Sequence, residues 1–407
     1  MNKKLYLLFL FVLIFRLFFA FQDEGYNDDN AYFTLRNVEH VKETGKPLFE
    51  DDLSYGGRES SFPPLYYYFL TMMDAILGDI IFKIVPAILF SALVFIVYFI
   101  TRELVRDEDS ALLATLISAF IPIFISTTLN NISILSAALF VMLLMIISLF
   151  RTKDKKYLNL FMGLSIILPL LHNIAFLFII SLVVYLIWSL VESDKIGAVK
   201  REAILFSIFI ILIIEFLLFK NAFLLHGFYL VYQNTPVKLL ATYFKDLKLV
   251  DLTLNLGILP LFFGIIGLVY GVIKRNDNVL LLSSMAITTF VLLILKTINF
   301  SLAIIFLGIL LSILSSIGFE KFFSYIKLTK FSNYVKYVKS SILILVFVLL
   351  LIPSYIEANK SMSNVISEEE LDALIWLRDQ TDKDSVVMSS YEEGHFITGI
   401  SKRKNVI

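Results

Sequence analysis

The fold of this chain is decided by residues 28–69, DDNAYFTLRNVEHVKETGKPLFEDDLSYGGRESSFPPLYYYF, which lie between two long apolar runs. The segment combines an adjacent acid pair, many aromatic residues and a Pro-Pro step that leads back into apolar sequence. Ordinary connections between helices are only a few residues long, so this length and composition indicate a functional loop. Because the flanking runs are long enough to cross a bilayer, we expect the loop at a membrane surface.

The rest of the chain is strongly apolar. Its 407 residues are 58% hydrophobic and 17% charged, with a mean hydropathy of +0.83. Apolar runs predict an all-α polytopic membrane protein of about eleven transmembrane helices. The runs fall near 5–21, 80–101, 110–128, 132–150, 158–171, 173–191, 203–219, 254–273, 279–295, 298–316 and 341–356. A formal charge of +0 provides no field for nucleic acid, and the lack of cysteine excludes thiolate catalysis and disulfides.

The basic residues predict how the chain is oriented. If the N-terminus is cytoplasmic, alternate crossings place the short basic loops, such as 102–106 and 151–156, on the cytoplasmic face. We therefore expect a multi-pass cell-membrane protein with residues 1–356 as its membrane domain. The first loop, 22–79, is then extracytoplasmic and includes an interfacial helix over 64–78. Residues 357–407, an amphipathic helix followed by a Val-rich strand, form a small extracytoplasmic α/β segment or begin a longer soluble domain.

The first loop carries groups suited to glycosyl transfer. Asp28 and Asp29 are adjacent carboxylates at a low-dielectric boundary, where one of them can act as a general base or both can hold a cation. Arg36 and Arg58 in the same loop are cations that could bind a departing phosphate. On charge alone, a solvated acidic loop is the alternative, since other acids surround them.

Two polar sites outside this loop are further candidates. His172, between two apolar runs, could bind a lipid phosphate or could be a helix-turn residue satisfied by the backbone. The pair Asn130-Asn131 could bind sugar hydroxyls, with Asn130 as the candidate ligand, although a simple turn is the alternative. The histidine spacing supports no metal site, while a divalent cation at the acid pair is left open. Glu215 lies within an apolar run, where it is either paired within the bundle, which we favour, or a proton-coupling residue of the rival function, a transporter or lipid flippase.

These residues resemble the GT-C superfamily of polyprenyl-phosphate-dependent membrane glycosyltransferases. The protein mannosyltransferases and aminoarabinose transferases of this superfamily share the pattern D-[DE]-x-x-Y after the first span, which Asp28, Asp29 and Tyr32 match. The resemblance implies an inverting sugar transferase with Asp28 or Asp29 as base, no required metal, and Tyr32 at the substrate. It also implies a polyprenyl (dolichyl) phosphate donor and a protein, lipid or glycan acceptor on the extracytoplasmic side.

The end of the chain resembles the oligosaccharyltransferases instead. Residues 376–378, Trp-Leu-Arg, and Val386-Val387 match the helix and strand that open their soluble domain. Their W-W-D-Y-G motif is replaced here by SYEEG at 390–394, and Asn130 stands where a second acidic motif would fall. These departures argue against asparagine-linked transfer and leave an oligosaccharyltransferase-like or non-catalytic paralogue as a further alternative.

Overall fold

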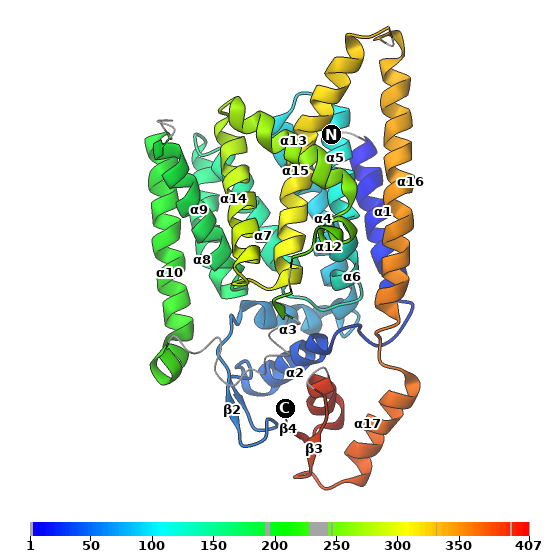
Figure 1. The fold of residues 1–407 in the computed structure, drawn as a ribbon. Helices are drawn as coiled ribbons and strands as arrows, with labels where there is room; N and C mark the ends of the chain where they lie inside the picture. Colours follow the sequence, from blue (N-terminus) through cyan, green and yellow to red (C-terminus); the bar gives the residue numbers. More distant parts are fainter. Residues whose placement is uncertain are drawn as a thin grey trace.

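The computed structural model describes residues 3–191, 196–227, 243–245, 247–330, 332–390 and 393–406, and it is mostly helical (Figure 1). Tyr391 and Glu392 of the replaced motif lie outside the described residues. The helices are α1 (Lys3–Ala20), α2 (Asp29–Thr44), α3 (Leu65–Leu77), α4 (Ile81–Leu104), α5 (Glu108–Ala119), α6 (Pro122–Thr128), α7 (Leu135–Phe150), α8 (Lys155–Leu171), α9 (Ile174–Val191), α10 (Ala198–His226), α12 (Leu249–Leu256), α13 (Ile258–Ile273), α14 (Asp277–Ile294), α15 (Phe300–Lys327), α16 (Val335–Met362), α17 (Glu368–Gln380) and α18 (Gly394–Phe396).

The helical bundle fits a multi-pass membrane protein. Among the described residues, 6 helices are long and apolar enough to cross a membrane, or up to 8 if the bent pairs α5–α6 and α12–α13 each form one span. Three more bundle helices miss this criterion: α1 carries three charges, and α7 and α8 have 16 and 17 residues. Six to eight candidate spans are therefore observed, and the total of eleven stays a prediction.

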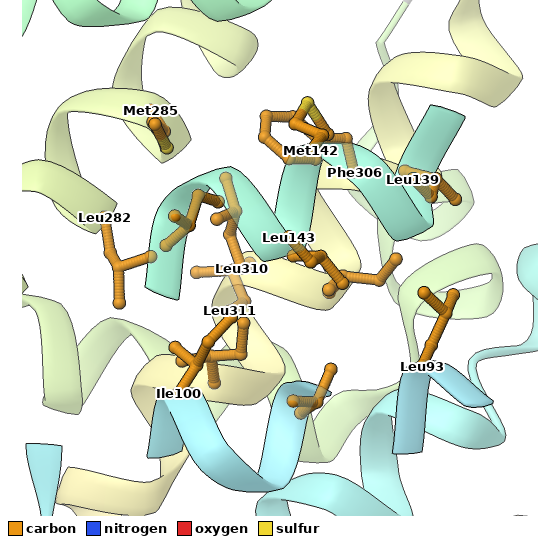
Figure 2. Close-up of a cluster of buried hydrophobic side chains, with 14 of the residues drawn as sticks. Leu93, Ile100, Leu139, Met142, Leu143, Leu282, Met285, Phe306, Leu310 and Leu311 are labelled. Carbon is orange, nitrogen blue, oxygen red and sulfur yellow. The ribbon is translucent and has the colours of Figure 1, made fainter. Parts of the chain in front are cut away.

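The core of the bundle is built around α15. Of its most apolar window, 94% is buried, compared with 22% for α16 at the periphery. Figure 2 shows Leu310 of α15 among buried side chains of α4, α7 and α14, including Leu143 and Leu282. Glycine allows α13 to pack directly on α15, because a Cβ at Gly267 would lie 1.9 Å from a carbonyl oxygen of that helix.

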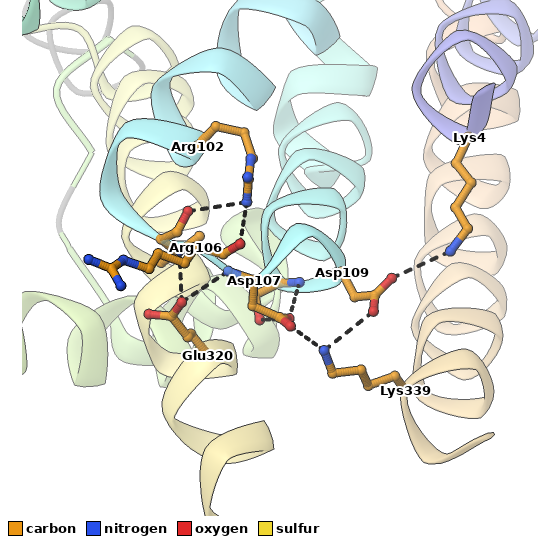
Figure 3. Close-up of polar contacts among 9 residues, drawn as sticks. Lys4, Arg102, Arg106, Asp107, Asp109, Glu320 and Lys339 are labelled. Carbon is orange, nitrogen blue, oxygen red and sulfur yellow. Dashed lines mark hydrogen bonds and ion pairs between the residues drawn. The ribbon is translucent and has the colours of Figure 1, made fainter. Parts of the chain in front are cut away.

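The two ends of the bundle differ in what covers them. At the end near the N-terminus, Lys339 pairs with Asp107 and Asp109, while Glu320 accepts hydrogen bonds from the backbone N–H groups of Arg106 and Asp107 at 2.8 and 3.0 Å (Figure 3). These contacts tie α15 and α16 to the start of α5.

The opposite end, which we call the loop end, carries α2, α3 and the segment from α17 to the C-terminus (Figure 1). The predicted interfacial helix over 64–78 is present as α3, although no membrane position is shown for it. The predicted C-terminal helix and strand are present as α17 and β3 (Val386–Met388).

Short strands join the C-terminal segment to the first loop. Strand β1 (Glu50–Asp51) pairs antiparallel with β2 (Arg58–Glu59), and β3 pairs parallel with β4 (Lys404–Val406). Asn405 then bridges to the β1–β2 turn, donating its N–H to the Leu53 carbonyl at 2.8 Å and accepting from the Tyr55 N–H at 2.9 Å. The end of the described chain is thus held against the loop that contains the acid pair.

Candidate functional site

Asp28 is the N-cap of α2, and its carboxylate is held from two sides. Oδ1 accepts hydrogen bonds from the backbone N–H and the Nδ2 of Asn30 at 3.0 and 2.9 Å. Oδ2 accepts from Nδ2 of Asn131, 103 residues further along the chain, at 2.9 Å. A carboxylate has about four acceptor positions, so these three bonds orient Asp28 and leave one position for a substrate proton.

Asp29 is the first residue of α2 and binds the C-terminal segment instead. Its Oδ1 accepts the Phe396 N–H at 2.8 Å and its Oδ2 accepts the His395 N–H at 3.1 Å. The pKa of Asp29 is raised to about 6, because desolvation and the charge of Asp28 raise it by more than these N–H groups lower it. The two adjacent acids therefore have different partners.

Tyr32 and Arg36, one and two turns further along α2, are both buried in packing contacts. The Tyr32 ring lies 4.8 Å from that of Phe396, and its hydroxyl accepts the Tyr26 N–H at 3.4 Å. Arg36 forms a bidentate ion pair with Asp51 at 2.7 and 3.0 Å. Burial alone would raise the pKa of Asp51, but hydrogen bonds and charge from Arg36 lower it below its usual value. Nη1 and Nη2 of Arg36 both donate to Asp51, so this ion pair holds β1 to α2.

Arg58 is close enough to His395 for its charge to act on the imidazole. It is exposed on β2, opposite Asp51 in the strand register. Burial, together with the positive charges of Arg36 and Arg58, lowers the pKa of His395 to about 4. Arg58 is therefore near the Asp29–His395 contact and free of the ion pair that occupies Arg36.

The remaining predicted residues lie in turns. His172 ends α8, and its Nδ1 accepts the Ile174 N–H at 2.9 Å, so its imidazole caps the start of α9. Asn130 takes a left-handed backbone conformation, with φ of 48°, and its Nδ2 donates to the Gly25 carbonyl at 2.9 Å. The structure thus brings Asn130 to the turn that precedes Asp28, whereas His172 serves a helix junction.

Sequence reasoning did not single out Asn131, the residue that contacts Asp28 directly. The Asn130-Asn131 dipeptide gave the signal, but only the geometry shows which amide reaches the carboxylate. Among the described residues, no group of three or more His, Cys, Asp or Glu side chains is placed to hold a metal ion. The side chain that contacts Oδ2 of Asp28 is the neutral amide of Asn131. Metal independence remains a prediction.

Comparison with known proteins agrees with this architecture. The family model of dolichyl-phosphate-mannose-protein mannosyltransferases matches residues 61–220. No curated protein matches the chain significantly in sequence. The oligosaccharyltransferase of Archaeoglobus fulgidus in its apo form has the same fold, with a TM-score of 0.71 at 15% identity over 98% of this chain.

Two ligand-bound structures share the fold as well. The Archaeoglobus fulgidus enzyme AglB, in complex with an inhibitory peptide and a dolichol-phosphate, gives a TM-score of 0.67 at 14% identity over 98% of this chain. ArnT from Cupriavidus metallidurans, bound to undecaprenyl phosphate, gives 0.60 at 10% identity, covering all of this chain and 86% of ArnT. The chain spans 64% of the length of the oligosaccharyltransferase.

Proposed function

We propose that the chain is a membrane glycosyltransferase of the GT-C type, which transfers a sugar from a polyprenyl-phosphate carrier to a protein, lipid or glycan acceptor; the family match and the shared fold support this proposal. The family match and the ligand-bound structures of AglB and ArnT support a lipid-phosphate donor. The positive-inside pattern of the short loops supports an extracytoplasmic location for the loop end.

The observation that carries this proposal is the different environment of the two acids. Asp28 is half-buried, oriented by Asn30 and Asn131, and retains an open acceptor position. Both carboxylate oxygens of Asp29 accept hydrogen bonds from backbone N–H groups of the C-terminal segment. A general base must reach the proton that it removes, so Asp28 is the base in this proposal and Asp29 a positioning residue.

The reaction is a single displacement. Asp28 accepts the proton of the acceptor group as its oxygen or nitrogen attacks the anomeric carbon. The bond from that carbon to the phosphate oxygen breaks, and the polyprenyl phosphate leaves with the electron pair. Attack opposite the leaving group inverts the anomeric configuration. In this proposal the charge of Arg58, an exposed cation of the loop, helps to offset the charge that develops on the leaving phosphate.

The test is sugar transfer by membranes that contain the full chain, using a panel of polyprenyl-phosphate sugars. Asp28→Asn is expected to lower kcat by at least about a hundredfold, the scale of a lost general base. Asp52→Asn, an exposed acid in the same loop, is the matched control and should retain activity. Both variants must remain monodisperse in detergent. A folded Asp28→Asn chain with unchanged kcat would refute the assignment of the base.

A transporter is the second candidate because of Glu215. This carboxyl is 1% exposed within α10, and neither oxygen has a hydrogen-bond partner among the described residues. Intramembrane acids of this kind occur in ion and proton pathways. Substrate that crosses sealed vesicles without any transfer of sugar would favour the transporter over the glycosyltransferase.

A further inference from the structure

Arg16 is a buried cation near the loop end of α1. It is 2% exposed and lies four residues before the helix ends at Ala20, which corresponds to about 6 Å along the axis. Its guanidinium lies 4.9 Å from the ring centroids of both Phe90 and Phe124, which contact each other edge to face. The side chain therefore points into the bundle, close to the loop end of α1.

The guanidinium is only partly satisfied by the protein. Nη1 donates to Thr128 Oγ1 at 3.0 Å, while Nε and Nη2 are buried and have no hydrogen-bond partner among the described residues. None of the ion pairs in the described part of the chain includes Arg16. Two aromatic faces compensate part of the buried charge, but they leave two N–H groups unpaired. Such a group suits an anion with several acceptor oxygens.

These N–H groups line a narrow pocket that also contains a second cation. Lys83, at the start of α4, donates to the carbonyl oxygens of Ala20, at 2.7 Å, and of Asp23. Asn130 and Asn131 form another part of the lining. The pocket has room for about one water molecule, so a single phosphoryl oxygen fits beside Arg16, whereas a whole sugar does not.

The pocket adjoins the proposed catalytic acid. Asn131 lines it and donates the same Nδ2 group to Asp28. Asn130 Oδ1 is buried without a described partner, and it can accept from a hydroxyl next to a bound phosphate. Asn131 thus belongs both to the lining of the pocket and to the contacts of the acid, which places a neutral amide next to each of them.

We propose that the pocket between α1, α4 and α6, with Arg16 and Lys83 as its cations, is a binding site for a phosphate ester. Under the proposed function, this phosphate is one carried by a lipid. This proposal rests on the proposed function, because the phosphate that it binds belongs to the polyprenyl carrier. Binding to the site can nevertheless be measured without sugar transfer.

The test is binding of farnesyl phosphate to the purified full chain in detergent, measured as the increase in melting temperature that the ligand causes. Farnesol, inorganic phosphate and phosphatidylglycerol are the comparison ligands. Arg16→Met should remain folded, because it replaces an incompletely paired charge with an apolar side chain, and should weaken farnesyl phosphate binding at least tenfold. Arg16→Lys restores part of the affinity, since it keeps the charge but not the fork. Arg201→Met, which removes an exposed arginine of α10, should bind as the native chain does.

Farnesol that binds as well as farnesyl phosphate, or a folded Arg16→Met chain with native affinity, would overturn the proposal. If Arg16→Met does not fold, farnesyl phosphate binding is measured with Lys83→Met. Native affinity of a folded Lys83→Met chain would then overturn the proposal. Competition by inorganic phosphate at equal concentration would support the site and identify free phosphate as the source. Equal binding of phosphatidylglycerol would support it as a general headgroup site. Arg16-dependent binding without sugar transfer from any donor would refute the proposed function alone.

Discussion

Separate replacement of Asp29 and His395 is expected to reveal two opposing titrations in the docking of residues 394–406 on α2. Asp29 accepts the N–H groups of His395 and Phe396, and burial raises its pKa to about 6. The His395 ring lies 4.9 Å from that of Phe33, and burial lowers its pKa to about 4. Both groups return to water when the segment dissociates, so both titrations affect docking.

The two effects have opposite signs. Docking raises the pKa of Asp29 from 3.8 to about 6. The contribution of Asp29 to docking is therefore fully present below pH 3.8 and is lost as the pH rises through about 6. The docked state lowers the pKa of His395 from 6.5, so its contribution is present above that pH and is lost as the pH falls through about 4. In the native chain, acidification therefore strengthens one contribution while it weakens the other.

The magnitudes follow from linkage between pH 8 and pH 5. Asp29 favours docking at the lower pH by about 1.4 kcal/mol, which screening at this half-exposed carboxyl reduces to about 1 kcal/mol. His395 opposes docking by about 2 kcal/mol over the same range. We expect a docking loss of about 1 kcal/mol on acidification in the native chain, and a larger loss of about 2 kcal/mol, roughly thirtyfold, in Asp29→Asn. His395→Gln should instead gain about 1 kcal/mol, roughly fivefold.

Hydrogen exchange of peptides within 394–406 measures docking in each chain at pH 8 and pH 5, after correction for the intrinsic exchange rate. Both variants retain the backbone N–H groups at 395 and 396, and the Asp29→Asn side chain would retain one acceptor oxygen. Peptides from the core of α15 provide the internal control, because nearly all of that helix is buried. The reasoning is refuted if protection in His395→Gln falls in acid, or if Asp29→Asn loses no more protection than the native chain.

Two further predictions concern stability. Arg36→Met should destabilise the chain by about 3–5 kcal/mol, because it leaves Asp51 as an unpaired buried charge, whereas the double variant with Asp51→Leu should recover most of this loss in denaturation experiments. Gly267→Ala should lower the melting temperature, because its Cβ would overlap an α15 carbonyl oxygen at a cost of about 1–3 kcal/mol. Gly163→Ala, where nothing lies within 4 Å, is the control and should stabilise α8 by about 0.5–1 kcal/mol; equal melting of the two variants would contradict the packing argument.

The sequence predicted the helical elements well where a local pattern specifies them. The aromatic run after Pro64 forms α3, and Ser367 begins α17 with a capping box that Glu370 completes. Both depend on residues within a few positions of each other. The number of spans does not follow from apolar length alone, since most of α7 is buried against other helices and this helix does not need the full length of a lipid-exposed span.

The roles within the site depend on contacts between distant residues, which a local pattern does not contain. Asp28 and Asp29 are equivalent in the sequence motif, but the start of α2 points one toward Asn131 and the other toward residue 395. Arg36 was a candidate for phosphate until the structure placed it on Asp51. Arg16 interrupts an apolar run, and only the fold shows that it faces a pocket near these acids. Each assignment needed a contact spanning from 15 to 366 residues of chain.

Asn131→Asp tests why this site has an amide where a second acid is plausible. The substitution would place a carboxylate at the position from which Nδ2 now donates to Asp28 at 2.9 Å. Two carboxylates this close share a proton or bind a cation, so the base is expected to become protonated at neutral pH or metal-bound. In EDTA, where no cation is available, the two acids of the variant should share a proton, and its transfer should fall below that of the native chain. Added Mn²⁺ should change the activity of the variant but not that of the native chain. Asn131→Ala separates this effect from loss of the hydrogen bond, because it removes the donor without adding charge and should show no response to Mn²⁺. Activity of the native chain that disappears in EDTA and returns with Mn²⁺ would contradict a metal-independent base at Asp28.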